Sequence, residues 1–380
     1  MREARNRNLA VKIGDGHLPA MDSFRGVAEK SFFPHPLFKN PHLATLLPCY
    51  WPRGGLLNNM PSESRLFAVT ADSRILGCCH WQPKARQSPV LVLVHGLEGS
   101  SESHYMLGVA HKAWAAGFSV IRLNQRNCGR TDHLTPTLYN SGLSGDLAAV
   151  IRELALHDGI SSVWLGGFSM GGNLVLRLAG EAGSDLPSLK GVAAISPTVD
   201  PESCVESLEQ SRGWIYQRYF VMKLRARLRR KANLFPGRFD LSRLRRIRTL
   251  RQFDDAYTAP DGGYESAEDY YCRTGARRVI GSIEVPTLII TAQDDPIVPY
   301  HSFENPALRD NPSIRLLAPK HGGHCGFIQR SQPFEDNYWA ENRLVEFAAA
   351  RSGNRPARAF NGVLDGSHHR RRHLHDATEL

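Results

Sequence analysis

The segment Gly167-Phe168-Ser169-Met170-Gly171 decides the fold of this chain. It follows the apolar run Val163-Trp164-Leu165 and precedes residues 172–182, whose apolar spacing is that of a helix. A serine flanked by glycines at a strand-to-helix turn is typical of a nucleophile elbow, a turn so tight that its neighbours must be nearly free of side chain. The turn exposes the serine hydroxyl at the carboxyl end of the strand. We therefore interpret Ser169 as a candidate nucleophile.

A second glycine-containing turn follows an earlier apolar run. Residues 90–94 read Val-Leu-Val-Leu-Val, and His95-Gly96-Leu97-Glu98-Gly99-Ser100 comes directly after them. In α/β-hydrolases an H-G-x-x-G turn supplies one N–H group of the oxyanion hole, and the residue after the nucleophile supplies the other. The pattern predicts that the backbone N–H groups of Leu97 and Met170 form the oxyanion hole.

A carboxylate at the end of a later strand is the candidate triad acid. Residues 285–292 form an apolar run that ends in Gln293-Asp294-Asp295-Pro296. A carboxylate at a strand end can accept a hydrogen bond from a histidine Nδ1–H and so orient the ring. We expect Asp295 to be the acid, because its spacing to Val298-Pro299 is usual in this superfamily. Asp294 remains the alternative, and the other aspartate would then be a turn or cap residue.

The candidate base lies on the loop after the last predicted strand, residues 313–318. The loop carries His321 and His324. We expect His324 to be the base, with His321 as the alternative, so that Ser169, Asp295 and His324 occur in the order that the fold requires. The spacing H-x-x-H also suits a metal, but no third ligand lies nearby in sequence and the loop is glycine-rich, so we expect no metal. The chemistry of such a triad needs no other cofactor.

Strand and helix patterns alternate from residue 90 to 195 and resume at residue 285. This alternation predicts an α/β-hydrolase fold with a mostly parallel, doubly wound sheet. Residues 64–82 alternate as antiparallel edge strands would. We expect a hydrolase domain over 31–351, a helical cap inserted at about 198–276 and a last helix at about 334–351.

The flanking segments differ from this domain in composition. Residues 1–30 are expected to be poorly structured, and residues 352–380 to be a disordered basic tail with little apolar periodicity. Five prolines between residues 31 and 53 indicate an extended arm packed on the body.

Composition indicates the compartment. Seven cysteines, an odd number without a C-x-x-C pair, favour a reducing compartment. The first residues lack the apolar region of a secretory signal, and no stretch approaches the roughly 18 apolar residues of a membrane span. We expect a cytoplasmic protein, with peripheral membrane contact left open.

Basic charge is concentrated in one segment. Residues 212–253 hold fourteen Lys or Arg and one acid, Asp240, whereas the whole 380-residue chain has a formal charge of +10. Within this segment, residues 221–231 suit either a surface helix that contacts an anionic membrane or a solvated helix with Leu224 and Leu228 packed inward. We expect no nucleic-acid partner, because few aromatics are interleaved and no recognised motif is present.

These motifs together resemble those of the YheT-like α/β-hydrolases, bacterial relatives of the eukaryotic ABHD lipases. The similarity covers about residues 31–350 and includes the arm sequence Pro41-His42-Leu43-Ala44-Thr45-Leu46. It implies hydrolysis of short- to medium-chain acyl esters, with Ser169, Asp295 and His324 as the triad. Asn140 stands where the family often has a histidine, and Asn127 stands where it tends to have glycine.

Three functions follow from this set of residues. We expect a serine carboxylic-ester hydrolase, esterase- or lipase-like, whose partner is a small acyl ester or lipid substrate. An acyltransferase or thioesterase would use the same acyl-serine with another acceptor or donor. A non-catalytic lipid-binding protein of this fold is the third reading, and the intact triad argues against it.

Overall fold

The computed structural model describes residues 30–53, 55–210 and 212–353. The predictions of a poorly structured N-terminus and a disordered basic tail lie outside these residues, apart from Lys30, Ser352 and Gly353. The described parts contain no helix that combines the length and the apolar character needed to cross a membrane.

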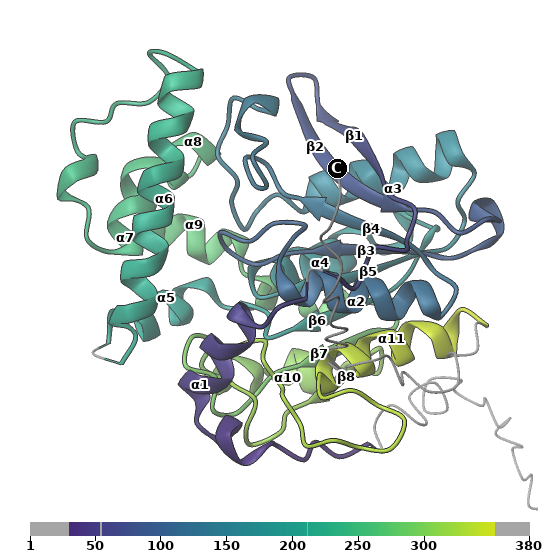
Figure 1. The fold of residues 1–380 in the computed structure, drawn as a ribbon. Helices are drawn as coiled ribbons and strands as arrows, with labels where there is room; N and C mark the ends of the chain where they lie inside the picture. Colours follow the sequence, from purple (N-terminus) through teal and green to yellow (C-terminus); the bar gives the residue numbers. More distant parts are fainter. Residues whose placement is uncertain (1–29, 54, 211, 354–380) are drawn as a thin grey trace, which may run out of the picture.

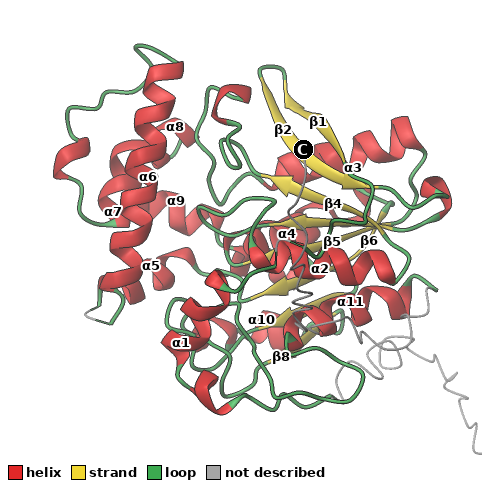
Figure 2. Ribbon diagram, in the orientation of Figure 1, coloured by secondary structure: helices red, strands yellow, loops and turns green. Residues whose placement is uncertain are grey.

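Eight strands form one twisted sheet in the order β1-β2-β4-β3-β5-β6-β7-β8, shown in Figures 1 and 2. The strands are β1 (Glu63–Thr70), β2 (Ser73–His80), β3 (Val90–Val94), β4 (Ser119–Asn124), β5 (Val163–Phe168), β6 (Leu189–Ile195), β7 (Thr287–Ile290) and β8 (Ile314–Leu317). β1 pairs antiparallel with β2 and β2 with β4, while all later pairs are parallel. The expected mostly parallel sheet with antiparallel edge strands is confirmed.

Helices cover both faces of the sheet. On one side α2 (His104–Ala115) and α11 (Trp339–Arg351) pack together, and on the other α3 (Ser144–Asp158) packs beside α4 (Met170–Ala182). β3 shows why helices are needed on both faces of the sheet. Its odd-numbered residues Leu91 and Leu93 join the core under α2 and α11, whereas Val92 and its even-numbered neighbours join the core under α3 and α4. A strand buried on both faces reads as a continuous apolar run, as residues 90–94 do.

The last helix is shorter than predicted. It begins at Trp339 rather than near residue 334. Phe334 has a left-handed backbone, with φ 66°, and Gln332 forms an isolated bridge with Glu335. A non-glycine residue with positive φ cannot lie within a right-handed helix, so the helix starts after this turn.

The arm over residues 31–53 packs on the body, but the prediction that it is extended is wrong. It contains the helix α1 (Pro41–Leu46) between short 3₁₀ turns. Asn40 caps α1, since its Oδ1 accepts hydrogen bonds from the N–H groups of His42 (2.9 Å) and Leu43 (3.2 Å). Pro41 at the first helical position supplies a preset φ there, so this proline starts a helix instead of extending the chain.

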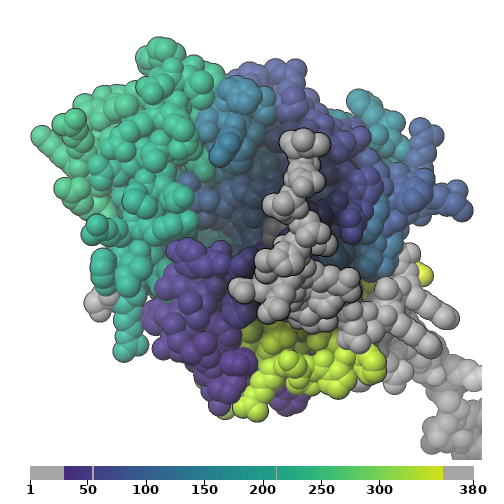
Figure 3. Space-filling view, viewed as in Figure 1, coloured from purple at the N-terminus to yellow at the C-terminus, as the bar shows by residue number. Residues whose placement is uncertain are grey.

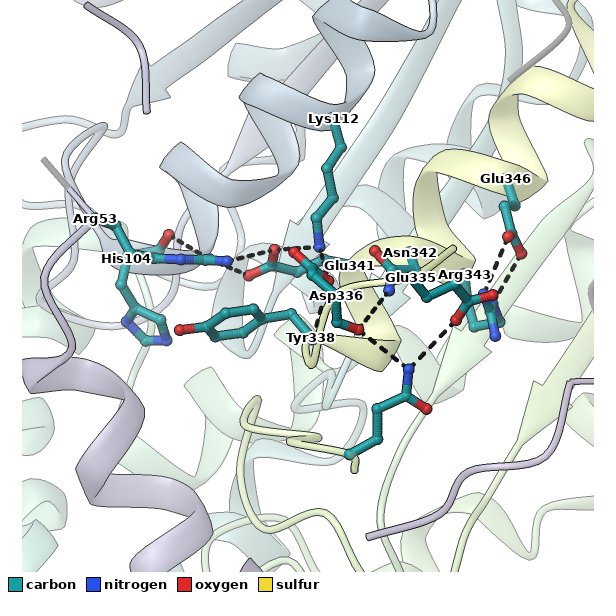
Figure 4. A network of polar contacts seen from close by, with 11 residues as sticks. Arg53, His104, Lys112, Glu335, Asp336, Tyr338, Glu341, Asn342, Arg343 and Glu346 are labelled. Atoms are coloured by element: carbon teal, nitrogen blue, oxygen red, sulfur yellow. Dashed lines mark hydrogen bonds and ion pairs between the residues drawn. The ribbon is translucent and has the colours of Figure 1, made fainter. Parts of the chain in front are cut away.

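A buried ionic network fastens the end of the arm to α2 and α11 (Figure 4). Glu341 accepts from Arg53 Nη2 at 3.1 Å and from Lys112 Nζ at 3.0 Å, and all three side chains are at least 94% buried. The Arg53 guanidinium also lies 3.5 Å from the Tyr338 ring centroid. Moving the arm away would separate Arg53 from Glu341 and leave a buried charge unpaired, which is strongly unfavourable. The network therefore holds the arm in place.

The chain between β6 and β7 carries the insertion, which lies to the left of the sheet in Figure 1. Its helices are α5 (Pro201–Glu209), α6 (Trp214–Leu234), α7 (Leu250–Phe253), α8 (Ala259–Gly262) and α9 (Ala267–Thr274), with a π-helical turn at Asp254–Thr258. In α6, Leu224 and Leu228 are buried, as expected for a helix packed through these residues. The short helix α10 (Pro306–Arg309) lies between β7 and β8.

Candidate active site

Ser169 lies at the turn between β5 and α4 in a strained conformation, with φ 53° and ψ −121°. Gly167 and Gly171 permit this turn. A Cβ at Gly167 would lie 2.3 Å from the Gly171 carbonyl oxygen, and one at Gly171 would lie 2.4 Å from the His95 carbonyl oxygen. Neither position has room for a side chain. The sequence prediction of a nucleophile-elbow geometry therefore matches the backbone.

Three side chains, each from a different loop or turn, form one hydrogen-bonded chain. They are Asp295, His324 and, at the end of the chain, Ser169. His324 Nε2 lies 2.9 Å from Ser169 Oγ, and His324 Nδ1 lies 2.9 Å from Asp295 Oδ2. The other carboxylate oxygen of Asp295 accepts from the N–H groups of Ile297 (2.8 Å) and Val298 (3.0 Å). The Asp295 side chain is fully buried, so these bonds fix its position.

The two alternative residues form a separate pair. Asp294 Oδ2 lies 3.1 Å from His321 Nδ1, and Asp294 Oδ1 accepts from the Gly323 N–H at 3.0 Å. This pair holds the loop that carries His324 and makes no recorded contact with Ser169. Within the described residues, no three His, Cys, Asp or Glu side chains gather closely enough to hold a metal ion.

The pKa of His324 is raised well above its usual 6.5. Burial lowers this pKa, but the charge of Asp295 and its hydrogen bond favour the imidazolium and outweigh the burial. An imidazolium cannot accept a proton from Ser169, so the neutral ring is the form able to act as a base.

We expect kcat/KM for ester hydrolysis to rise with pH along a limb centred above pH 6.5. Below that limb His324 is protonated and inactive, and above it the neutral ring predominates. A pH series with a neutral ester, whose own charge does not change, measures the limb directly. A limb centred below pH 6.5 would contradict the assignment of a raised pKa to His324.

The turn after β3 lies against Ser169. A Cβ at Gly96 would be only 2.9 Å from the Ser169 Cβ, and Leu97 lines the same cavity as Ser169 and Met170. Met170 begins α4, so its N–H belongs to the first turn of the helix and has no partner within the helix. The structure thus brings both residues predicted for the oxyanion hole beside Ser169.

His95 fixes the start of this turn from inside the protein. Its Nδ1 lies 2.8 Å from the Gly96 carbonyl oxygen, and its Nε2 accepts from the Gln125 N–H at 3.2 Å. Burial lowers the pKa of His95 to about 4, so the ring is neutral near pH 7. A neutral ring with the proton on Nδ1 satisfies both bonds, which gives this histidine a supporting role.

A buried ion pair joins the same turn to the insertion. Glu98 has a left-handed backbone, with φ 58°, and its carboxylate binds Arg227 of α6 through two bonds of 2.8 and 3.0 Å. The exposed fractions of the two side chains are 4% and 6%. Tyr139 adds to the clamp, because its hydroxyl donates to Glu98 Oε1 and accepts from the Glu98 N–H, both at 2.9 Å. Arg227 and Glu98 therefore hold the residue next to Leu97.

We expect Arg227→Met to lower kcat by about tenfold to a hundredfold with little change in KM, because the released turn would displace one oxyanion donor. Adding Glu98→Gln should restore part of the rate by removing the uncompensated carboxylate. The matched control is Arg230→Met, which removes an exposed arginine of the same helix, paired with Asp132 at 3.3 Å. Equal losses in both single variants, or a proportional rise in KM, would contradict a positioning role.

The arm supports the loop that carries His324. Thr45 of α1 donates from Oγ1 to the Pro41 carbonyl oxygen at 2.7 Å, and the same atom accepts from the His324 N–H at 2.9 Å. On the other side of the loop, Ser196 Oγ accepts from the Cys325 N–H at 3.1 Å. The backbone of the histidine loop is thus fixed from two sides by segments far away in the sequence.

A mostly apolar cavity opens beside Ser169, between the sheet and the insertion. Its wall combines Leu97 and Met170 with Val205, Leu208, Phe220 and Leu224 of the insertion helices. One carboxylate, Asp254 of the π-helical turn, also lines it and accepts from the Tyr271 hydroxyl at 2.6 Å. Burial raises the pKa of Asp254 to about 6. The cavity therefore suits a ligand with a substantial apolar part.

Comparison with known proteins agrees with this geometry. A sequence model of the alpha/beta hydrolase fold family matches residues 89–331, which include β3, the elbow and His324. The chain belongs to the α/β-hydrolase family. This α/β-hydrolase is 32% identical over 318 residues to the putative esterase YheT of Escherichia coli (strain K12), covering 83% of this chain and 92% of YheT. The resemblance to the YheT-like proteins is confirmed.

Two further relatives extend the comparison. The α/β-hydrolase is 30% identical over 256 residues to the phospholipase ABHD3 of Mus musculus, covering 67% of this chain but only 62% of the phospholipase. Among solved structures, the Pyrococcus furiosus esterase Pf2001 superposes with a TM-score of 0.52 at 17% identity, over 85% of this chain and 99% of the esterase. At that identity the likeness shows the fold alone.

Proposed function

We propose that this α/β-hydrolase is a serine carboxylic-ester hydrolase that acts on short- to medium-chain acyl esters through an acyl-serine. The observation that carries the proposal is the continuous hydrogen-bond chain from Asp295 through His324 to Ser169, with both distances at 2.9 Å. Names of relatives support an ester substrate, since they include a putative esterase and a phospholipase.

In the proposed mechanism Ser169 Oγ attacks the ester carbonyl carbon while its proton passes to His324 Nε2. Asp295 stabilises the imidazolium, and the N–H groups of Leu97 and Met170 hold the oxyanion. His324 then gives the proton to the leaving alcohol as the C–O bond breaks. Water, deprotonated by the same histidine, attacks the acyl-serine and releases the acid, which restores the free serine.

The apolar wall of the cavity would take the acyl chain. Phe220 and Leu224 of α6 and Leu208 of α5 lie on that wall. Burying a methylene group there stabilises the complex by roughly 0.8 kcal/mol. Binding should therefore strengthen with each added methylene until the cavity is filled, and longer chains should gain nothing further.

A p-nitrophenyl ester series from C2 to C16 tests the proposal. We expect kcat/KM to rise with chain length up to medium chains and to rise no further beyond them. Intact-mass measurement during turnover should show one acyl group added to the protein. Turnover that persists when Ser169 is replaced by alanine would contradict the acyl-serine. Adding glycerol as acceptor separates hydrolysis from acyl transfer, because transfer would produce acylglycerol in place of free acid.

A further inference from the structure

The outer face of α6 and the neighbouring part of the arm expose large apolar side chains. Among the described residues this set, here called the apolar rim, comprises Tyr50, Trp51, Trp214, Ile215, Tyr219 and Met222. The exposed fraction is 80% for Tyr50 and between 45% and 58% for the others. Single exposed apolar residues are common on proteins, but a group of this size marks an interaction surface.

The arm and α6, the two segments that carry the rim, are in direct contact. The His42 ring of α1 stacks on Tyr216 of α6, with ring centroids 5.9 Å apart, and His42 Nδ1 lies 2.9 Å from the Tyr216 hydroxyl. In Figure 3 the purple arm and the teal insertion lie side by side on one face. The two parts of the rim therefore lie on adjoining segments of one face.

Exposed basic side chains occur along the same helix. α6 contains no acidic residue, and Arg218, Lys223, Arg229 and Arg230 are exposed along it. Lys223 Nζ lies 5.6 Å from the Tyr219 ring centroid, so positive charge and aromatic surface alternate on the same face. A helix with aromatic and aliphatic residues among Lys and Arg is typical of binding at an anionic lipid surface.

The opposite face of the same helix lines the catalytic cavity. Phe220 and Leu224 face that cavity, whereas Ile215, Tyr219 and Met222 face outward. We propose that the apolar rim and the basic residues of α6 dock the protein on an anionic lipid surface, with the rim side chains entering the headgroup region. Docking does not depend on hydrolysis, and it would bring the cavity next to lipid.

Co-sedimentation with vesicles tests the docking surface, using the full chain with Ser169→Ala so that no lipid is hydrolysed. We expect binding to vesicles containing phosphatidylglycerol at low salt, weaker binding to pure phosphatidylcholine and a loss of binding as salt rises. The combined substitution Ile215→Ser, Tyr219→Ser and Met222→Ser should weaken the binding by about tenfold or more, since it removes the inserted apolar area. The substitutions Arg218→Gln and Lys223→Gln should weaken binding to the anionic vesicles and leave that to phosphatidylcholine nearly unchanged.

The matched control is Leu66→Ser with Leu156→Ser, because these residues are 47% and 78% exposed on β1 and α3, away from the insertion. This control should bind vesicles like the parent chain. The rim substitutions should also be made in the chain that keeps Ser169. There they should leave turnover of a soluble short-chain ester unchanged, which would show that the variant is folded. Absence of binding to anionic vesicles at low salt would overturn the proposal, as would a rim variant that binds as well as the control.

Discussion

Replacing Ser169 by alanine is expected to lower kcat for p-nitrophenyl ester hydrolysis by about 10⁴- to 10⁶-fold, since the acyl-serine cannot form. The loss should appear in kcat rather than in KM, because the cavity wall stays intact. Thermal stability should change little, because alanine can occupy the same turn with the same backbone strain. Steady-state kinetics beside a thermal melt of both proteins gives the comparison.

Ser141→Ala is the matched control for this substitution, because Ser141 lines the same cavity and lies outside the hydrogen-bond chain of His324. It should keep most of the activity. If Ser169→Ala retained turnover within tenfold of the parent, Ser169 would not be the nucleophile and the proposed mechanism would fail.

Asp295→Asn is expected to lower kcat by about 10³- to 10⁴-fold, because an amide no longer selects the productive tautomer of His324 or stabilises its positive charge. The ascending limb of the pH profile should also move to lower pH, since the charge that raises the pKa of His324 is removed. Both effects are measured in one pH series on the variant.

Asp294→Asn is the neighbouring control. Asp294 binds His321 and the Gly323 N–H, so its loss should loosen the histidine loop and cost less than about tenfold in kcat. Equal losses of kcat for the two variants would contradict the separate roles of Asp294 and Asp295. A larger loss for Asp294→Asn would assign the triad acid to that residue.

The sheet and the elbow could be predicted from the sequence because local patterns encode them. The apolar run at 90–94 indicates a strand covered on both faces, and the glycines around Ser169 indicate a turn without room for side chains. The order of Ser169, Asp295 and His324 was also readable, since each follows the end of a predicted strand. The arm was predicted wrongly, because its prolines start a short helix and turns, and only the cap at Asn40 shows which form they take.

The residues that support the site could not be predicted from the sequence. Arg227 lies within a run of basic residues, and this run predicts a surface or solvated helix without distinguishing Arg227 from its neighbours. It turns inward because Glu98, 129 residues away, offers a buried carboxylate. Thr45 belongs to the arm motif, and nothing in that motif indicates that its hydroxyl binds the backbone of His324 across 279 residues.

The sequence by itself determined the strand-and-helix alternation, the strained serine turn and two candidates each for the acid and the base, because each depends on steric and apolar patterns within a few residues. Tertiary structure alone decided that His324 meets Ser169 across 155 residues, that the insertion clamps the turn at Glu98 and that the rim of α6 faces outward. Such contacts depend on which charged groups and apolar faces the folded chain brings together from distant parts of the sequence. A buried guanidinium and an exposed one look the same in a sequence, and only the burial of a matching carboxylate distinguishes them.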